Sequence, residues 1–388
     1  MINSDANFVV SKLPDVKTTI FSTMSQLAQT YDAINLGQGF PDFTCDPALI
    51  DKVHQAMLAG QNQYPPMTGM PALRQAIVAK VRELYQASYD IDTEITVTSG
   101  ATQAIMTCLL ACVHAGDEVI VIEPAYDSYI PTITLAGGIP ILIPMQLKNQ
   151  VFSIDWDKVQ SSINKKTRLI IINSPHNPTG SSMSHQDLET LANIVRDTRI
   201  LILSDEVYEH MVFDEQAHVS VASHAELASR SFVVSSFGKT YHVTGWKVGY
   251  VLAPGILTTE FRKVHQFNVF TVNTPMQVGI ANYMQEASHH LHLSKFYQEK
   301  RDFFRQGLQG SQFKLLPTQG TYFQCVDYSA ISSLNELDFA TWLTKEIGVA
   351  AIPVSAFYQN QTQNNLVRFC FAKKTSTLQE ALERLRQV

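Results

Sequence analysis

The chain has 388 residues, of which 45% are hydrophobic and 16% are charged, and its net charge is −6. This length can build two or three units with cores of their own, and the low charged fraction predicts that much surface is buried in a subunit contact. A net negative charge without basic blocks argues against nucleic acid as the main partner. Residues 1–6 lack a secretory signal and no apolar run could span a bilayer, so we expect no membrane association and a soluble, cytoplasmic protein.

From the N-terminus, helical spacing of apolar residues predicts a helix over residues 18–31. A tight loop follows over 34–42, where Gly39 lies between Gln38 and Phe40. Two further helices are predicted over 46–60, with Gly60 as the stop, and over 71–85.

Strands and helices alternate from about residue 94 onward. The predicted strands cover 95–98, 118–122, 139–143, 168–173, 200–204, 232–235 and 248–253, and the helices between them cover 100–115, 127–136, 155–163 and 184–197. This alternation predicts an α/β fold with a large, doubly wound and mostly parallel sheet, whose ligands bind beyond the carboxyl ends of the strands.

The pattern becomes helical after Pro254. We expect one long helical region, made of 261–270 and 277–287 and interrupted at Pro275, and helix onward to about Leu308. Strand-like runs over 320–326 and 366–371, a helix over 338–346 and a last helix over 377–386 complete a smaller α+β domain. We expect the large domain to cover 47–282 and the small one 1–46 plus 283–388, because chain ends often lie close together.

Metal is not expected. Cys108 and Cys112 lie one helical turn apart in an apolar run, which is typical of core packing. The cluster His289-His290-x-His292 has no acidic or cysteine residues near it, so we expect it on a polar surface.

Four polar segments fall at the ends of predicted strands. Ser99-Gly100-Ala101-Thr102 opens a helix, where free N–H groups and the helix dipole suit a phosphate. Asn177 lies in a turn between two prolines. Asp205 ends an apolar strand, where a carboxylate needs a cationic partner. Lys239 follows the next strand and is expected in a loop. Each alone is an ordinary turn or helix cap, but four together indicate a site.

Gly238-Lys239-Thr240 by itself is also found in the phosphate loop of nucleotide hydrolases. That motif needs a glycine five residues before Gly238, and the chain has Val233 there, so this reading is excluded.

Together these motifs identify a family. The sequence resembles the fold type I pyridoxal-phosphate (PLP) aminotransferases of class I/II over nearly its whole length, and is most similar to the bacterial methionine aminotransferases and the kynurenine/glutamine transaminases. The resemblance rests on Leu36 to Phe43, Asn177-Pro178-Thr179-Gly180, Ser204 to Tyr208, Ser236 to His242 and Gly245 to Gly249.

The resemblance implies a role for each matching residue. Lys239 would form the Schiff base with the cofactor aldehyde, and Asp205 would pair with the pyridine nitrogen. Tyr208 and Asn177 would bind the ring oxygen, and Tyr126 would stack on the ring. The phosphate would be held by Gly100, Ala101, Thr102, Ser236, Lys247 and, in a homodimer, the partner's Tyr64. Many aminotransferases have arginine in place of Lys247, although the relatives named above share the lysine.

The resemblance also implies the substrate contacts. Arg368 would grip the substrate carboxylate, helped by Asn177 and the Gly39 backbone. The side chain of the substrate would meet Ile20, Phe21, Phe357 and the partner's Phe270. These apolar and aromatic residues suit methionine, aromatic amino acids, kynurenine or the stem of glutamine, and each is as well explained as an ordinary core residue.

The chemistry expected is a ping-pong transfer of an amino group from an L-amino acid to a 2-oxo acid, with Lys239 as the proton carrier. An aspartate-type transaminase is disfavoured, because no clear second arginine is found. A carbon–sulfur β-lyase acting on cysteine conjugates is the alternative enzyme. A regulatory protein on the same scaffold would add a DNA-binding domain, for which we expect no room.

Overall fold

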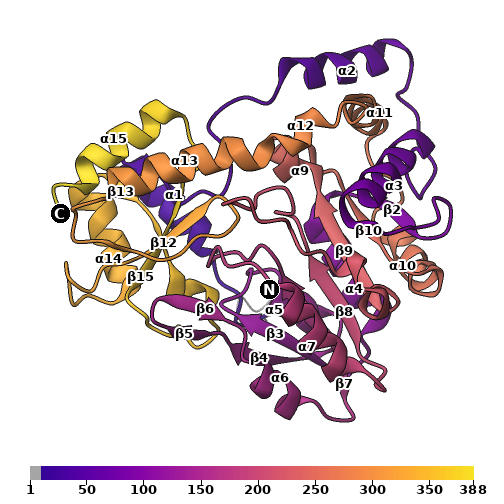
Figure 1. Cartoon of the computed structure of the whole chain (residues 1–388), viewed down its shortest axis with the longest axis horizontal. Coiled ribbons are helices and arrows are strands. Elements are labelled where there is room, and N and C mark those ends of the chain that lie inside the picture. Colours follow the sequence, from indigo (N-terminus) through magenta and orange to yellow (C-terminus); the bar gives the residue numbers. More distant parts are fainter. Residues whose placement is uncertain (1–9) are drawn as a thin grey trace, which may run out of the picture.

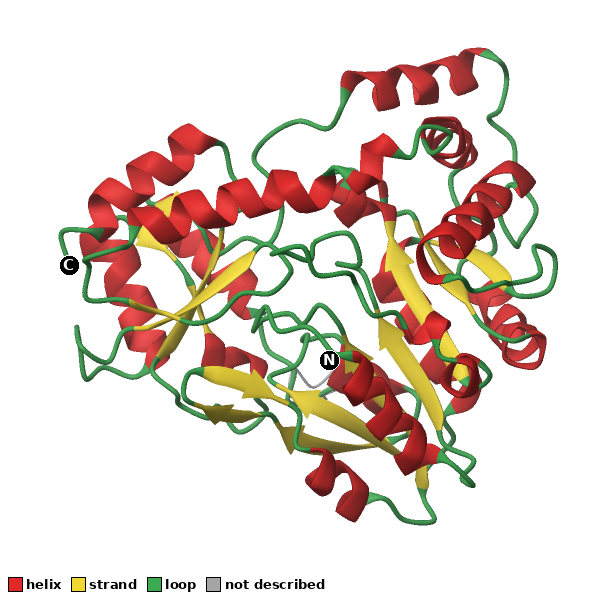
Figure 2. Ribbon diagram, viewed as in Figure 1, coloured by secondary structure: helices red, strands yellow, loops and turns green. Residues whose placement is uncertain are grey.

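The computed structural model describes residues 10–388 (Figures 1 and 2). Its main feature is a seven-stranded sheet, in which only β10 runs antiparallel to its neighbours. The strand order is β2 (Ile95–Thr98), β10 (Gly249–Leu252), β9 (Ser231–Ser236), β8 (Leu201–Asp205), β7 (Thr167–Asn173), β3 (Glu118–Glu123) and β4 (Ile139–Pro144). The predicted mostly parallel sheet is therefore confirmed.

Helices cover both faces of this sheet, because its strands are apolar on both sides. In β3, Val119 and Val121 join one buried core, while Ile120 and Ile122 join the other. The first core includes α4 (Gly100–Cys112), α5 (Tyr129–Leu135) and α10 (Gly255–Asn268). The second includes α2 (Pro47–Leu58), α3 (Pro71–Tyr85), α6 (Trp156–Ser162), α7 (His185–Val195) and α11 (Thr274–Tyr283). Cys108 and Cys112 are buried in the first core, as predicted.

A second, four-stranded antiparallel sheet lies on the left in Figure 1. Its strands are β11 (Lys314–Leu315), β12 (Phe323–Asp327), β15 (Leu366–Cys370) and β14 (Ile352–Pro353). It shares a third core with α1 (Ile20–Thr30), α13 (Leu293–Gly307), α14 (Glu336–Trp342) and α15 (Thr375–Leu385). The N-terminal segment joins this unit, since β1 (Ile34–Asn35) pairs with β13 (Val349–Ala350). The smaller α+β part is thus confirmed, while the boundaries at 46/47 and 282/283 stay a prediction.

The remaining elements are short. They are the hairpin β5 (Gln146–Lys148) and β6 (Val151–Ser153), the helices α8 (Ala225–Ala228), α9 (Phe237–Thr240) and α12 (Ser288–Leu291), the 3-10 helices η1 (Val221–Ser223), η2 (Thr244–Trp246) and η4 (Val354–Phe357), and the π-helix η3 (Leu343–Ile347).

Two of the predicted elements were wrong. The predicted interruption of the helical region at Pro275 lies instead between α10, which ends at Asn268, and α11, which begins at Thr274. Asn273 caps α11 by accepting a hydrogen bond from the Met276 N–H, and Pro275 lies in the first turn, where its missing N–H costs nothing. Lys239 lies in the one-turn helix α9 rather than in a loop.

The prediction of a polar surface for the histidine cluster holds for His292, which is exposed, but was wrong for His290. His290 is 4% exposed, and its ring lies 5.0 Å from that of His210. Within residues 10–388, no group of histidine, cysteine and acidic residues could hold a metal ion. No helix in that range is long and apolar enough to cross a membrane. Predictions on the first nine residues lie outside the described part of the chain.

Candidate active site

One cavity gathers most of the residues predicted from the sequence. It lies where β7, β8 and β9 end and α4 begins, and the second sheet contributes Phe323 and Arg368. The predicted residues that line it are Phe21, Gly39, Gly100, Ala101, Thr102, Tyr126, Asn177, Asp205, Tyr208, Ser236, Lys239, Lys247 and Arg368.

The start of α4 forms an anion-binding corner of this cavity. Gly100 has a φ of +74°, and the amine of Lys247 lies beside it, so that a Cβ on Gly100 would be 3.5 Å from Lys247 Nζ. Gly249 of β10 lets two backbones approach, because a Cβ there would lie 2.6 Å from the Ser235 carbonyl oxygen. Free helix N–H groups, an ammonium and the nearby Ser236 hydroxyl together suit a phosphate.

Asp205 ends β8 on the cavity side of the sheet and is 4% exposed. Its Oδ2 accepts a hydrogen bond of 2.6 Å from the Tyr129 hydroxyl, and its Oδ1 accepts one of 3.3 Å from the Val207 N–H. Burial raises the pKa of this carboxyl to about 6. The predicted cationic partner is not found among the ion pairs of residues 10–388, and a phenol hydroxyl takes its place.

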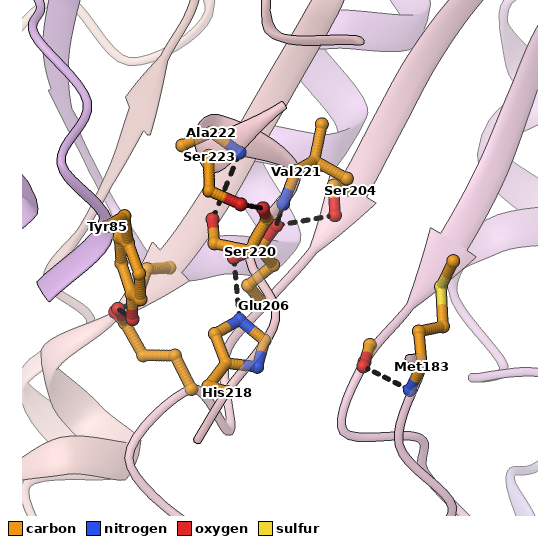
Figure 3. Close-up of polar contacts among 12 residues, drawn as sticks. Tyr85, Met183, Ser204, Glu206, His218, Ser220, Val221, Ala222 and Ser223 are labelled. Carbon is orange, nitrogen blue, oxygen red and sulfur yellow. Dashed lines mark hydrogen bonds and ion pairs between the residues drawn. The ribbon is translucent and has the colours of Figure 1, made fainter. Parts of the chain in front are cut away.

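The next acid along the chain, Glu206, has a different environment (Figure 3). Its Oε1 accepts hydrogen bonds of 2.8 Å from the Ser204 hydroxyl and 3.0 Å from the Val221 N–H. Its Oε2 lies 2.8 Å from Nε2 of His218. Both oxygens of Glu206 are therefore occupied by protein groups, which is typical of a structural carboxylate.

Arg368 in β15 is fully buried in the wall of the cavity. It donates hydrogen bonds of 2.6 Å to Asn177 Oδ1 and 3.2 Å to the Gly37 carbonyl, and its guanidinium lies 3.7 Å from the centre of the Phe323 ring. Its Nε has no partner, and no ion pair between described residues includes Arg368. A buried cation without an acid is costly, so this arrangement is suited to a carboxylate from outside the chain.

The position of Asn177 comes from its turn. The Ser174–Pro175 and Asn177–Pro178 peptide bonds are both cis. The Asn177 N–H donates to Asn173 Oδ1 at 2.9 Å, and the Asn177 side chain accepts from Arg368.

The Lys239 side chain is held in place by hydrogen bonds at its terminal amine. Its Nζ donates to the Tyr322 hydroxyl at 2.6 Å and to the Gly39 carbonyl at 3.1 Å. Burial lowers the pKa of the Lys239 amine to about 8, so a sizeable fraction is neutral near physiological pH.

Four predicted residues lie outside the cavity lining. Ile20 and Phe357 line an adjoining cavity beside Tyr126, and the Phe357 ring lies 5.8 Å from that of Phe21. Tyr64 is 81% exposed, and its ring lies 5.4 Å from that of Phe270 on the surface. Within one chain, Tyr64 and Phe270 therefore do not reach the cavity.

Sequence reasoning missed two tyrosines of the site. Tyr129 is the first residue of α5, whereas Tyr126 lies before that helix, so helical spacing offered no signal for it. Tyr322 follows Gln319-Gly320-Thr321, and nothing in that stretch pointed to Lys239, which lies 83 positions away.

The model of the family "Aminotransferase class I and II" matches residues 31–385. The chain belongs to this family. Class I and II aminotransferases transfer amino groups between amino acids and 2-oxo acids, are generally dimeric and use PLP. The protein is therefore a transaminase.

The aminotransferase is similar to known relatives along nearly its whole length. It is 48% identical to the methionine aminotransferase of Escherichia coli over 97% of this chain and 98% of that one. The crystal structure of an E. coli protein that was identified as a methionine aminotransferase matches with a TM-score of 0.96, over 98% of this chain and 99% of that one. A probable N-succinyldiaminopimelate aminotransferase of Mycobacterium tuberculosis is 38% identical, and rat kynurenine–oxoglutarate transaminase 1 is 33% identical, each over 97% of both chains.

The chemistry of the residues that line the cavity fits PLP, the cofactor of the family. The corner at Gly100 and Lys247 has free donors for a phosphate, and the positive φ of Gly100 there would strain any side chain. Asp205 is a buried acid that lacks a cationic partner among the described residues, and Lys239 carries an amine whose lowered pKa favours attack on an aldehyde.

Proposed function

We propose that the aminotransferase holds PLP in this cavity. Lys239 would be the covalent anchor, Asp205 the partner of the pyridine nitrogen, and Tyr208 and Asn177 the partners of the ring oxygen. Tyr126 would stack on the ring. The phosphate would bind the start of α4 at Gly100, Ala101 and Thr102, with Ser236 and Lys247. The lining of the cavity by all these residues supports the proposal.

The reaction follows from how the side chains are placed. Arg368 binds the substrate carboxylate through the donors that Asn177 and Gly37 leave free, and so orients the Cα. Bound PLP supplies an electron sink for the bonds at Cα. Lys239, once released, takes the Cα proton as general base and passes it on as general acid. The same residues serve the 2-oxo acid in the second half of a ping-pong cycle.

We propose methionine and other large, apolar or aromatic L-amino acids as the donors. Phe21, Phe323 and Tyr126 present apolar surface to the cavity, and Ile20 and Phe357 lie just behind it. Among the described residues that line the cavity, Arg368 is the single arginine, so a second carboxylate has no bidentate partner. The E. coli relative at 48% identity supports the same substrate class.

We further propose a homodimer, located in the cytoplasm, in which Tyr64 and Phe270 reach the partner's cavity. Both aromatic rings lie exposed side by side, and Phe267 on the preceding helix is 85% exposed. Exposed aromatic clusters of this kind are typical of subunit contacts. The domain division at 47–282 is part of the same proposal.

The experiment is a half-reaction with the PLP-loaded enzyme. L-Methionine, L-phenylalanine, L-kynurenine, L-glutamine, N-succinyldiaminopimelate and L-aspartate are each mixed with it, and loss of the imine absorbance is followed. We expect methionine to react about 100-fold more efficiently than aspartate, because burying an unpaired carboxylate is costly. Equal or faster reaction of aspartate would contradict the proposed donors.

The β-lyase alternative is tested on the same preparation. Cystathionine is supplied, and pyruvate and ammonia are measured against amino transfer from methionine. Faster release of pyruvate would favour the lyase and overturn the proposed transfer reaction.

A further inference from the structure

The amine of Lys239 is held by a residue that no motif pointed to. Tyr322 lies just before β12 in the second sheet, whereas Lys239 lies at the end of β9 in the first. Nevertheless, Lys239 Nζ and Tyr322 Oη are 2.6 Å apart, and both groups contact the Gly39 carbonyl oxygen, at 3.1 Å and 2.5 Å. The proton carrier of the first sheet is therefore held entirely by groups of the second unit.

The hydrogens in this triangle have one consistent arrangement. The Gly39 carbonyl can only accept, and it accepts from the Tyr322 hydroxyl, which uses the single hydrogen of that hydroxyl. Tyr322 Oη must then accept from Lys239, as Gly39 also does. A neutral amine has two N–H bonds and one lone pair. Both N–H bonds of Lys239 are thus engaged, and its lone pair points away from Tyr322 and Gly39 into the cavity.

The position of the Tyr322 hydroxyl is fixed by its surroundings. Its ring is fully buried, and ring centres of Phe323, Tyr208 and Tyr297 lie 4.8, 5.2 and 5.6 Å away. Burial raises the pKa of the Tyr322 phenol, so the hydroxyl stays protonated and keeps donating to Gly39. The acceptor for Lys239 is therefore rigid, as accurate proton transfer requires.

We propose that Tyr322 is a positioning residue for catalysis: its oxygen holds the released Lys239 amine so that the lone pair faces the substrate Cα. This inference rests on the proposed function. The amine forms an N–H bond to the Cα proton while the C–H electron pair stays with the substrate, and the ammonium then passes that proton on and becomes neutral again. Because Gly37 contacts Arg368 and Gly39 contacts Lys239, one backbone segment joins carboxylate binding to the proton carrier.

The test is Tyr322→Phe, with Tyr297→Phe as the matched control. Tyr297 is also fully buried and lies against Tyr322, but its hydroxyl has no hydrogen-bond partner among residues 10–388. For Tyr322→Phe in the PLP-loaded enzyme, we expect kcat with L-methionine to fall about 30-fold while KM changes less than about threefold. The isotope effect with α-deuterated methionine should rise, because proton transfer becomes more rate-limiting.

A second readout needs no turnover. The rate at which the cofactor-free protein forms an imine with added PLP is measured against pH. The neutral amine is the nucleophile, so for the wild type the rate should rise with pH, with a midpoint of about 8. Losing an acceptor that favours the ammonium should lower the midpoint by about one unit in Tyr322→Phe and leave it unchanged in Tyr297→Phe.

The outcomes separate this inference from the proposed function. An active wild type, together with unchanged kcat, isotope effect and pH midpoint in Tyr322→Phe, would overturn the role of Tyr322 and leave the transaminase proposal intact. An effect on KM alone, or equal losses in Tyr297→Phe, would also overturn it. A wild type that fails the half-reaction with every donor would refute the proposed function, and the pH midpoint would still test the contact.

Discussion

Two buried cations of the molecule, Lys80 and Arg368, have very different environments. On the face away from the cavity, Lys80 donates to Glu209 at 2.7 Å and to the Tyr250 hydroxyl at 2.6 Å, and Glu209 also accepts from Tyr85 and Ser235. In the wall of the cavity, Arg368 of the second sheet has an Nε without a partner and forms no ion pair with any described residue, although Asp127 is near enough to interact with it electrostatically. Both cations are buried, so the two sites differ in how completely each charge is paired.

The same contrast separates two consecutive residues. Asp205 accepts one short hydrogen bond, from Tyr129, and one long one, from the Val207 N–H, whereas Glu206 has three close partners (Figure 3). Side chains alternate across a strand, which sends these two acids to opposite faces. Incomplete pairing of a buried charge therefore distinguishes a functional group from a structural one.

The largest expected effect is on activity, in Arg368→Met. Removing the only arginine among the described lining residues should lower kcat/KM for L-methionine about 1,000-fold, because a charge-assisted, bidentate contact is lost. The free energy of unfolding should change by less than about 1 kcal/mol, since an unpaired buried charge contributes little stability. Steady-state kinetics and urea denaturation measure the two. Loss of stability without loss of activity would contradict the comparison.

The opposite pattern is expected in Lys80→Met. It leaves Glu209 buried without its cation, which should lower the free energy of unfolding by about 3–5 kcal/mol, while kcat/KM falls less than about tenfold. The double variant Lys80→Met/Glu209→Gln is the control and should recover part of the stability, because it also removes the unpaired charge. A double variant as unstable as Lys80→Met would show that the unpaired Glu209 charge does not cause the loss of stability.

The smallest effect is expected in Tyr129→Phe. Asp205 loses its closest donor, so its carboxylate is less well oriented and PLP should bind about tenfold more weakly. The matched control is Tyr283→Phe, which removes a 2.8 Å hydrogen bond to Asp46 and should leave PLP affinity unchanged, because neither residue lines the cavity. Affinity is measured by titrating the cofactor-free protein. Equal affinities in both variants would contradict a role for Tyr129.

Much of this site could be predicted because its chemistry follows strand ends. Asp205, Asn177 and Lys239 each come directly after a recognisable strand, and parallel strands bring such residues to one edge. The contacts of Tyr322 and Gly39 with Lys239 depend on how the second unit packs against the first, which no local pattern encodes. Pro275 was misread because proline in a first helical turn looks the same in sequence as proline in a break.

The most direct test of the central claim uses the unaltered protein. Borohydride reduction of the PLP-loaded enzyme fixes the pyridoxyl group on the lysine that carries it, and peptide mass spectrometry locates that lysine. We predict the label on Lys239 alone, the lysine whose amine lies in the cavity with a lowered pKa. Label on Lys247 or Lys80 instead, or no label, would contradict the account.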